Sequence, residues 1–582
     1  MTPLSARLKL VLDACTNAYR ELVMSDRPWL TSYDEGVPPT LEIPDFPLSE
    51  LLNQMADRYA DNPALYFFGS KMTYRTLNEK VNQFANLLIR EGIQPGDRVA
   101  LYLPNCPPCV IAFFAVLRAG AVLTQLNPLY SSGETAHQLK DSGARHVITL
   151  DRFVPILREV AGDCGLKKVW VTRINDYFPI PLKWLYPLKA KKEKTWVDWP
   201  KEPLFSSFVG ELEKFPAAPV QIPVKMDDTA LFQYTGGTTG IAKGVILTHR
   251  NLMANAFQCK AWFPGLPEGS EVFMLAIPIF HCYGMTAGMT FALAMGAAMV
   301  LVPKFEVEAV LKAVDKYQVA IFPGVQAIYV AINNYKDVGK YNVRSIQACI
   351  SGAGPLHQEV QKKFEELTGG KLVEGYGLTE ASPVTHCNPV YGKRKIGKIG
   401  LPFPGTDCKI MDVETGNREM LTGEIGEIAV KGPQVMKGYW NHPEETAMVL
   451  KDGWLYTGDI GFMDEDGFFA IVDRKKDMVK VGGENVYPRD VEEVLFQNEK
   501  VLDCVAAGVP DEKLGDKIKA YIVLKPGCLS TPAEIIEFCK GKLAKYKVPK
   551  EVEFRESLPK NMVGKMLRRL LVEEEKAKLK KN

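Results

Sequence analysis

The chain of 582 residues is 46% hydrophobic and 24% charged, which is the composition of an ordinary globular protein. Its length exceeds what one hydrophobic core usually serves, so we expect two or more domains. Lys and Arg outnumber Asp and Glu by only 71 to 69, so the overall charge gives no indication of binding to nucleic acid.

The cysteines and the apolar stretches indicate in which cellular compartment the protein is expected. Twelve cysteines are scattered along the chain, which favours a reduced, cytoplasmic protein. Cys106 and Cys109 form a lone C-P-P-C; a redox or zinc role is the alternative, but no second pair at ligand spacing accompanies it. The N-terminal residues carry charges throughout, unlike a secretory signal. The uncharged stretch 272–303 is long enough to span a membrane, but its prolines and glycines favour a buried strand, loop, helix and strand.

The first half of the chain alternates helical and strand patterns. Apolar residues recur at helical spacing over 77–88 and the helix is expected to close at Gly92. Strands are predicted at 98–103 and 146–150, with a helix through 113–116 between them. This alternation predicts an α/β fold with parallel-rich sheets covered by helices.

Residues 171–215 interrupt the alternation. Aromatic residues and prolines lie beside Lys189, Lys191, Lys192 and Lys194. One interpretation is an insertion that touches a membrane surface, at the inner face of the membrane. The other, which we prefer at this point, is a solvated loop with a few anchoring aromatics.

The stretch 234–247, YTGGTTGIAKGVIL, combines two strands with a glycine-rich loop. Strands are predicted at 229–234 and 245–248. Between them the glycines let the backbone N–H groups approach an anion, while the threonines and Lys243 add donors and charge. A flexible turn is the alternative, and the spacing does not fit a Walker A loop. We therefore predict a phosphate-binding loop.

Two further loops are predicted to meet the phosphate loop at one pocket. Strands are expected at 297–302, 319–322, 345–351 and 371–374, and the last two end in SGAGPL and EGYGLTE. In open α/β sheets ligands bind beyond the carboxyl ends of strands. Glu380 could hold Mg²⁺ there, or could be an ordinary acid at the start of a surface helix. The Tyr376 ring, between two glycines, could lie against a flat base.

From residue 397 onward short β segments predict a β subdomain, and from 476 short α and β units predict a small α+β domain. A helix is predicted at 488–496, and the tail after Lys565 is interpreted as a solvated helix. Asp459 and Arg474 could bind ribose hydroxyls, or each could be half of a structural salt bridge.

Four motifs, YTGGTTGIAKG, EGYGLTE, the stretch from YTGD through VDRKKD to GGENVYP, and PKNMVGK, resemble in order the core motifs of the adenylate-forming superfamily. Gly237 and Ala242 replace a Ser and a Pro common in other branches. With RPWLTSYDEGVP and DYFPIP, these departures resemble bacterial long-chain fatty acid CoA ligases.

The resemblance implies an N-terminal domain of residues 1–475, with two α/β subdomains and a β subdomain, and a mobile C-terminal domain of residues 476–582. It implies a two-step reaction in which ATP, with Mg²⁺, activates a long- or medium-chain fatty acid as an acyl adenylate that coenzyme A then captures. A CoA ligase for an aryl or other carboxylic acid is the alternative. Two further interactions are possible: peripheral contact with a membrane, and pairing with a second copy of the chain in a homodimer.

The resemblance also implies roles for particular residues. The catalytic residues are expected to be Thr235, His281, Glu380 and Lys565, with Thr235 and Glu380 at Mg²⁺. For His281 an ordinary core histidine is an equal alternative. The triphosphate is expected at Thr235, Gly236, Gly237, Thr238, Thr239, Gly240 and Lys243. Adenine is expected at Gly352, Ala353, Gly354, Glu374, Gly375 and Tyr376, and Gly377 and Thr379 are expected to be further cofactor-binding residues. Ribose, hinge and CoA contacts are expected at Asp459, Arg474, Lys476, Lys480, Gly482, Gly483 and Asn485.

Overall fold

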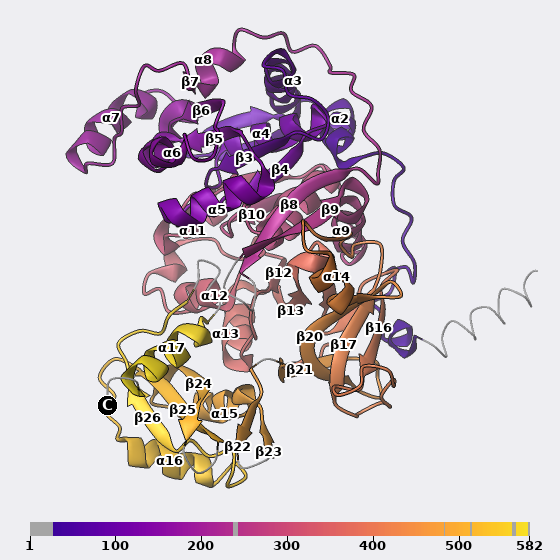
Figure 1. The fold of residues 1–582 in the computed structure, drawn as a ribbon, viewed down its shortest axis with the longest axis vertical. Helices are drawn as coiled ribbons and strands as arrows, with labels where there is room; N and C mark the ends of the chain where they lie inside the picture. The colour runs from indigo at the N-terminus through magenta and orange to yellow at the C-terminus, as the bar shows by residue number, and fades with distance from the viewer. Residues whose placement is uncertain are drawn as a thin grey trace, which may run out of the picture. The chain divides into compact units, whose positions relative to one another are not determined.

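The computed structural model describes residues 27–236, 242–475, 477–481, 484–511, 515–560 and 566–579. Within these ranges the chain forms two compact units. The large unit comprises Ser32–Asp407 and Lys431–Leu455. The small unit comprises the segment ending at Thr31, Cys408–Val430 and the chain from Tyr456 onward. Both are mixed α/β structures, as the sequence predicts (Figure 1).

The large unit contains an eight-stranded sheet in the order β18-β9-β8-β4-β3-β5-β6-β7. Its strands are β3 (Arg98–Tyr102), β4 (Val122–Gln125), β5 (His146–Leu150), β6 (Lys168–Thr172), β7 (Phe205–Ser207), β8 (Thr229–Gly236), β9 (Ala242–Thr248) and β18 (Gly438–Tyr439). All neighbours from β8 to β7 pair in parallel, whereas β9 is antiparallel to β8 and to β18. The predicted parallel-rich sheet is confirmed, with a hairpin at one edge.

A second set of strands carries the other two predicted loops. It consists of the sheets β10-β11-β1-β2 and β12-β13-β14-β15. The strands are β1 (Pro63–Phe67), β2 (Ser70–Thr73), β10 (Val272–Leu275), β11 (Ala298–Leu301), β12 (Ala348–Ser351), β13 (Lys371–Gly377), β14 (Val384–Cys387) and β15 (Leu401–Pro402). The predicted strand 319–322 is wrong as a strand, because only single bridges at Ile321 link β10 to β12.

Helices cover these sheets. They are α2 (Leu48–Arg58), α3 (Tyr74–Arg90), α4 (Pro107–Arg118), α5 (Ser132–Ser142), α6 (Val154–Val160), α7 (Leu182–Lys192), α8 (Phe208–Leu212), α9 (His249–Ala261), α10 (Phe291–Ala294), α11 (Val307–Tyr317), α12 (Gln326–Asn333), α13 (Gln358–Thr368) and α14 (Pro443–Val449). The stretch 272–303 is strand, loop, helix and strand, with a π-helical turn η4 (Gly284–Thr290) leading into α10. Among the described residues, none of the helices combines the length and apolar character needed to cross a bilayer.

The C-P-P-C motif is part of the core. Cys106 and Cys109 lie at the start of α4, all of whose residues are buried, and both thiols are free. Burial raises the pKa of the Cys109 thiol to about 12. A thiol that stays protonated at neutral pH is a poor nucleophile and metal ligand.

The small unit begins with a β region. Its strands β16 (Asp407–Met411), β17 (Gly426–Lys431) and β20 (Trp454–Met463) are neighbours in that order, and β21 (Phe469–Arg474) pairs with β20. β19 (Leu450–Lys451) forms a tight hairpin with Trp454 and Leu455, the first residues of β20, within the segment that belongs to the large unit. The short strands that the sequence predicts from residue 397 onward are therefore observed between residues 407 and 474.

The remainder of the small unit is an α+β domain. Its sheet has the order β23-β22-β25-β24, with β26 paired to β25, and its strands are β22 (Val479–Val481), β23 (Glu484–Val486), β24 (Val501–Asp511), β25 (Gly515–Leu524) and β26 (Glu551–Phe554). Its helices are α15 (Pro488–Phe496), α16 (Pro532–Lys540) and α17 (Arg568–Leu579). Side chains of β24 alternate between two cores, one beneath α15 and α16 and one beneath α17.

The tail is a helix, but the expectation that it is solvated is wrong. Leu571 of α17 is fully buried against β24 and β25. Arg568 donates hydrogen bonds to Asp477 at 2.9 Å and to Glu492 at 2.7 Å. Most of the Lys and Glu residues are exposed, but Glu575 is buried and lies 3.0 Å from Lys519 of β25, so composition alone did not indicate the buried face of the helix.

Candidate functional site

The hairpin of β8 and β9 positions the predicted phosphate loop. Thr235 and Gly236 end β8, and in the antiparallel register Thr235 lies opposite Lys243. The predicted loop residues Gly237, Thr238, Thr239 and Gly240 lie outside the described residues. The two strands thus bring a hydroxyl and an ammonium group to the base of this loop.

Glu380 follows β13 in the 3₁₀ turn η6 (Thr379–Ala381), which contacts β9. Its half-buried carboxylate accepts a hydrogen bond at Oε1 from the Tyr439 hydroxyl, at 2.8 Å. Its main-chain carbonyl accepts a second from the Met436 N–H. Tyr439 lies on β18, opposite Val245 of β9. The carboxylate is therefore fixed next to the strand that carries Lys243.

Tyr439 is suited to hold an ionised carboxylate. Burial, and then the neighbouring Glu380 carboxylate, raise the pKa of the Tyr439 hydroxyl. The hydroxyl therefore stays protonated and donates at neutral pH. A carboxylate and a threonine hydroxyl are hard oxygen donors of the kind that Mg²⁺ accepts, and Mg²⁺ completes its shell with water and phosphate oxygens. Glu380 and Thr235 therefore fit the ion chemically.

Lys243 is held in a defined position by an ion pair. Its Nζ lies 2.8 Å from Glu445 Oε1 and 5.8 Å from the centre of the Tyr439 ring. The lysine side chain is only 14% exposed. The Lys243 ammonium lowers the pKa of the Glu445 carboxyl, which keeps the pair ionised. His442 Nδ1 lies 2.6 Å from the other oxygen of Glu445.

The predicted adenine loops are tightly packed. A Cβ on Gly352 would lie 2.9 Å from the Tyr283 ring, and one on Gly377 would lie 2.1 Å from a backbone carbonyl oxygen of Pro383. Ala353 has a left-handed backbone, with φ of +63°. Such close approach explains the glycines, because a side chain at either position would collide with its neighbour.

Glu374 and Tyr376 project from β13 beside these glycines. The Glu374 carboxylate is buried and accepts a hydrogen bond from the Leu356 N–H at 3.3 Å. Tyr376 pairs across strands with His386, and their ring centres are 5.8 Å apart. Burial lowers the pKa of His386 to about 3, so the imidazole beside Tyr376 is neutral.

The loop containing His281 joins the two sets of glycines. Its half-buried imidazole accepts a hydrogen bond at Nδ1 from the Tyr283 N–H, at 3.2 Å. The adjacent Cys282 Sγ lies 3.3 Å from Thr379 Oγ1, and the Tyr283 hydroxyl donates to the Ile350 carbonyl at 2.7 Å. The large unit therefore brings His281, the SGAGPL loop and the EGYGLTE loop together.

Asp459 and Arg474 belong to the small unit and pair with each other. They lie opposite one another on β20 and β21, with Arg474 Nε 3.1 Å from Asp459 Oδ1. The Asp459 side chain is 4% exposed and that of Arg474 is 37% exposed. The salt-bridge alternative is thus observed.

The remaining predicted residues lie in or near the C-terminal domain. Lys480 is exposed on β22, opposite Asn485 of β23. Lys476, Gly482, Gly483 and Lys565 lie outside the described residues. Two residues that the sequence analysis missed are Tyr439 and Glu445. They lie within G-Y-W and P-E-E, which have no periodicity. The sequence therefore does not indicate that Tyr439 reaches Glu380 from β18 or that Glu445 reaches Lys243 from α14.

Comparison with known proteins identifies the family. A model described as AMP-binding enzyme matches residues 52–440, and one described as AMP-binding enzyme C-terminal domain matches residues 490–565. The chain belongs to the AMP-binding enzyme family. The first match covers both the β8–β9 hairpin and the Tyr439–Glu380 pair.

Relatives of this AMP-binding enzyme match nearly end to end. A long-chain-fatty-acid–CoA ligase from Bacillus subtilis is 46% identical over 556 residues, 95% of this chain and 99% of the relative. The ligase of that name from Salmonella typhimurium is 40% identical over 95% of this chain and 99% of the relative. Among solved structures, ATP-bound MatB from Rhodopseudomonas palustris superposes with a TM-score of 0.79 at 29% identity, covering 90% of this chain and 98% of that one. The anthranilate CoA ligase AuaEII, in complex with anthranoyl-AMP, gives 0.82 at 26% identity, covering 93% and 99%.

Proposed function

We propose that this AMP-binding enzyme joins a long-chain fatty acid to coenzyme A, consuming ATP and releasing AMP and pyrophosphate. The observation that carries the proposal is the Glu380 carboxylate, fixed by Tyr439 beside the strand of Lys243. The 46% identity to the Bacillus subtilis ligase supports a fatty acid, over the aryl acids of more distant structural relatives. A medium-chain acid is the neighbouring substrate class.

In the first step a fatty acid carboxylate oxygen attacks the α-phosphorus of ATP and pyrophosphate leaves. Lys243 and the N–H groups at the base of the phosphate hairpin would bind the triphosphate, because two anions must be brought together. Glu380 and Thr235 would hold Mg²⁺, which when bound screens the phosphate charges. Lys565 would bridge the acyl carboxylate and the α-phosphate, and His281 would orient the carboxylate.

In the second step the CoA thiolate attacks the acyl carbonyl and AMP leaves. We propose that residues 476–582 rotate as a domain about Lys476 between the steps, which withdraws Lys565 and presents Gly482 and Gly483 to CoA. A hinge of this kind absorbs a change of backbone angles in a few residues. Lys480 and Asn485 would then contact AMP or CoA.

Gly352–Gly354 and Glu374–Tyr376 would frame the adenine, and Asp459 and Arg474 would bind the ribose. For the acyl chain, we propose a wall of apolar side chains that are all buried in the large unit: Phe280, Met285, Met289, Phe322 and Val325. Each methylene that such a wall covers contributes about 0.8 kcal/mol. Chain length should therefore strongly affect affinity.

The proposal is tested with purified protein, ATP, Mg²⁺, CoA and a panel of carboxylic acids. Pyrophosphate release and thioester formation should be fastest with long-chain fatty acids. Robust turnover of benzoate or coumarate without turnover of fatty acids would instead support the aryl-CoA ligase. A cytoplasmic location with peripheral membrane contact, and a homodimer, are further proposals; sedimentation velocity tests the latter.

A further inference from the structure

Helix α7 has an exposed apolar face that has no role in the proposed reaction. Trp184, Leu185 and Leu188 are 68%, 57% and 69% exposed, and Ile180 just before the helix is 64% exposed. Spacings of three and four residues place Trp184, Leu185 and Leu188 on one side of the helix. Large apolar side chains gathered on one face indicate an interaction site, whereas scattered ones do not.

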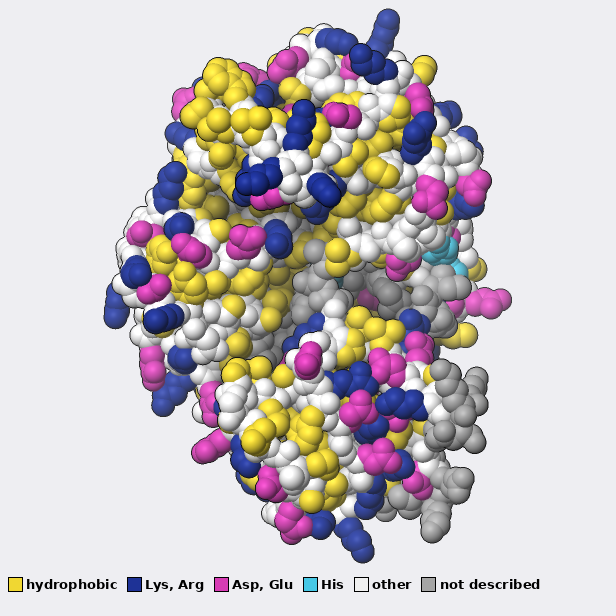
Figure 2. Space-filling view, turned by 90° about the vertical axis from the view of Figure 1, so that its left-hand side faces the viewer, with side chains coloured by type: hydrophobic (Ala, Val, Ile, Leu, Met, Phe, Trp, Pro, Cys, Tyr) yellow, Lys and Arg dark blue, Asp and Glu magenta, His cyan; other side chains and the backbone are white. Residues whose placement is uncertain are grey.

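Basic residues continue the same face. Lys191 and Lys192 follow Leu188 by three and four residues and are exposed. Residues 180–194 contain five lysines and a single acid, Glu193, which lies 3.9 Å from Lys189. The surface therefore has an apolar patch at its first two turns and positive charge at its last. Figure 2, which faces the side where α7 lies in Figure 1, shows hydrophobic side chains among Lys and Arg in its upper part.

The helix is anchored by its other side. The Asn175 side chain donates to the Lys183 carbonyl at 3.0 Å, and Phe178 packs edge-on against Tyr186 with ring centres 5.3 Å apart. Ala190 is buried. The inner face is thus in use, and the apolar outer face is held outward rather than turned toward the core.

The segments on both sides of α7 are tied to the eight-stranded sheet. The Arg173 guanidinium, next to β6, lies 3.6 Å from the centre of the Trp196 ring and 4.5 Å from that of Trp199. Arg173 also lies 3.8 Å from the buried Asp151. This cluster closes the insertion into a fixed loop, so that α7 is presented on a rigid base.

We propose that α7 is a docking surface for anionic lipid bilayers. A helix with Trp and Leu on one face and lysines beside them lies in the plane of a membrane, with the apolar side chains at the acyl boundary and the ammonium groups among anionic headgroups. Charge complementarity selects an anionic lipid, because each lysine near such a surface strengthens partitioning by about fivefold. If the proposed function holds, and only then, this contact also places the enzyme at the phase in which long-chain acids dissolve.

Vesicle flotation tests the proposal without any substrate. The full-length protein is mixed with phosphatidylglycerol vesicles or with phosphatidylcholine vesicles. It should float with the first, less so as salt rises, and much more weakly with the second. Trp184→Ala/Leu185→Ala/Leu188→Ala should lose at least tenfold in partitioning, and Lys191→Gln/Lys192→Gln about tenfold or more. Leu529→Ala, a change at a leucine that is 87% exposed in the other unit, is the matched control and should float as the parent does.

A second measurement guards against loss of folding in the triple variant. Vesicles should shift the tryptophan emission of the parent to the blue, and the single variant Trp184→Phe should float normally but lose that shift. Equal flotation of the parent and both α7 variants would overturn the proposal, as would failure of the parent to bind phosphatidylglycerol vesicles. Self-association that the triple variant abolishes, without vesicle binding by the parent, would assign the face to a second copy of the chain. Turnover of a long-chain fatty acid supplied in detergent solution without vesicles separates failure here from failure of the ligase proposal.

Discussion

Tyr439→Phe is the most informative substitution at the candidate site. It deletes one hydroxyl that donates to Glu380 Oε1 at 2.8 Å and leaves the ring below Lys243 in place. A hydrogen bond to a charged group contributes about 1.5–3 kcal/mol, and because Glu380 is half-buried, water can replace part of it. We therefore expect about a tenfold higher Mg²⁺ concentration at half-maximal rate, near the lower end of that range.

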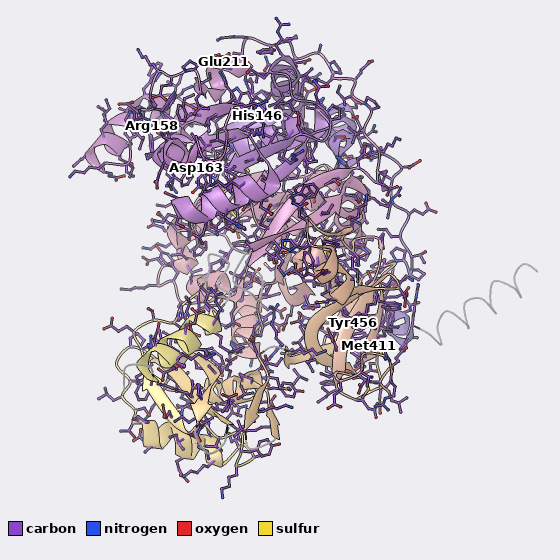
Figure 3. All side chains as sticks on the ribbon, viewed as in Figure 1. His146, Arg158, Asp163, Glu211, Met411 and Tyr456 are labelled. Atoms are coloured by element: carbon purple, nitrogen blue, oxygen red, sulfur yellow. The ribbon has the colours of Figure 1, made fainter. Side chains whose placement is uncertain are left out.

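The assay is pyrophosphate release at fixed ATP and fatty acid across a series of free Mg²⁺ concentrations. Saturating Mg²⁺ should restore most of the rate, because the carboxylate itself is still present. Tyr456→Phe is the matched control. Tyr456, labelled in Figure 3, lies on β20 and donates its hydroxyl to the Gly416 carbonyl at 3.0 Å. An unchanged Mg²⁺ dependence in Tyr439→Phe, or the same shift in the control, would refute the assignment.

The remaining predictions concern charge, packing and titration. Glu445→Gln releases the lysine of β9 for phosphate and should lower the KM for ATP by about fivefold, so an unchanged or higher KM would argue against competition by this carboxylate. Gly377→Ala should cost about 1–3 kcal/mol of stability, seen as a lower melting temperature. Gly354→Ala, where a Cβ meets no atom within 4 Å, should melt like the parent; similar losses in both would contradict the packing argument. Burial lowers the pKa of His386 to about 3, so stability should fall as pH drops from about 6.5 toward 3, by up to about 1.4 kcal/mol per pH unit. His386→Met should flatten that slope, and an unchanged slope in urea titrations would assign the loss to other groups. Lys565→Ala should slow adenylation by about 10²–10³ while thioester formation from supplied acyl adenylate survives; equal losses in both steps would contradict the rotating domain.

The sequence predicted best those features that depend on local pattern. The helix α15 (Pro488–Phe496) was predicted with its observed bounds, and the two strands flanking the predicted phosphate loop were predicted in place but two and three residues too short on the side of the loop. Each carries apolar residues at the period of its own secondary structure, and glycine or proline marks its end. The position of Glu380 at the end of a strand followed from the same reasoning.

Features that depend on distant pairing could not be predicted. Tyr439 lies 59 residues from Glu380, and its two-residue strand has no periodic signal. The apolar stretch 319–322 is buried like a strand, yet only Ile321 forms bridges to its neighbours. In the tail, Leu571 belongs to the apolar run 570–572 between two arginines and three glutamates, and a run this short did not indicate its contact with the sheet. Hydrophobicity indicates burial in these cases but does not specify which backbone groups pair.

The most direct test of the proposed chemistry follows an oxygen atom. A long-chain fatty acid labelled with a heavy oxygen isotope in its carboxylate is incubated with the protein, ATP, Mg²⁺ and CoA, and the AMP is analysed by mass spectrometry. Attack of the carboxylate on the α-phosphorus predicts one labelled oxygen in the phosphate of AMP and none in pyrophosphate. Unlabelled AMP, or ADP and labelled inorganic phosphate, would contradict activation through an acyl adenylate.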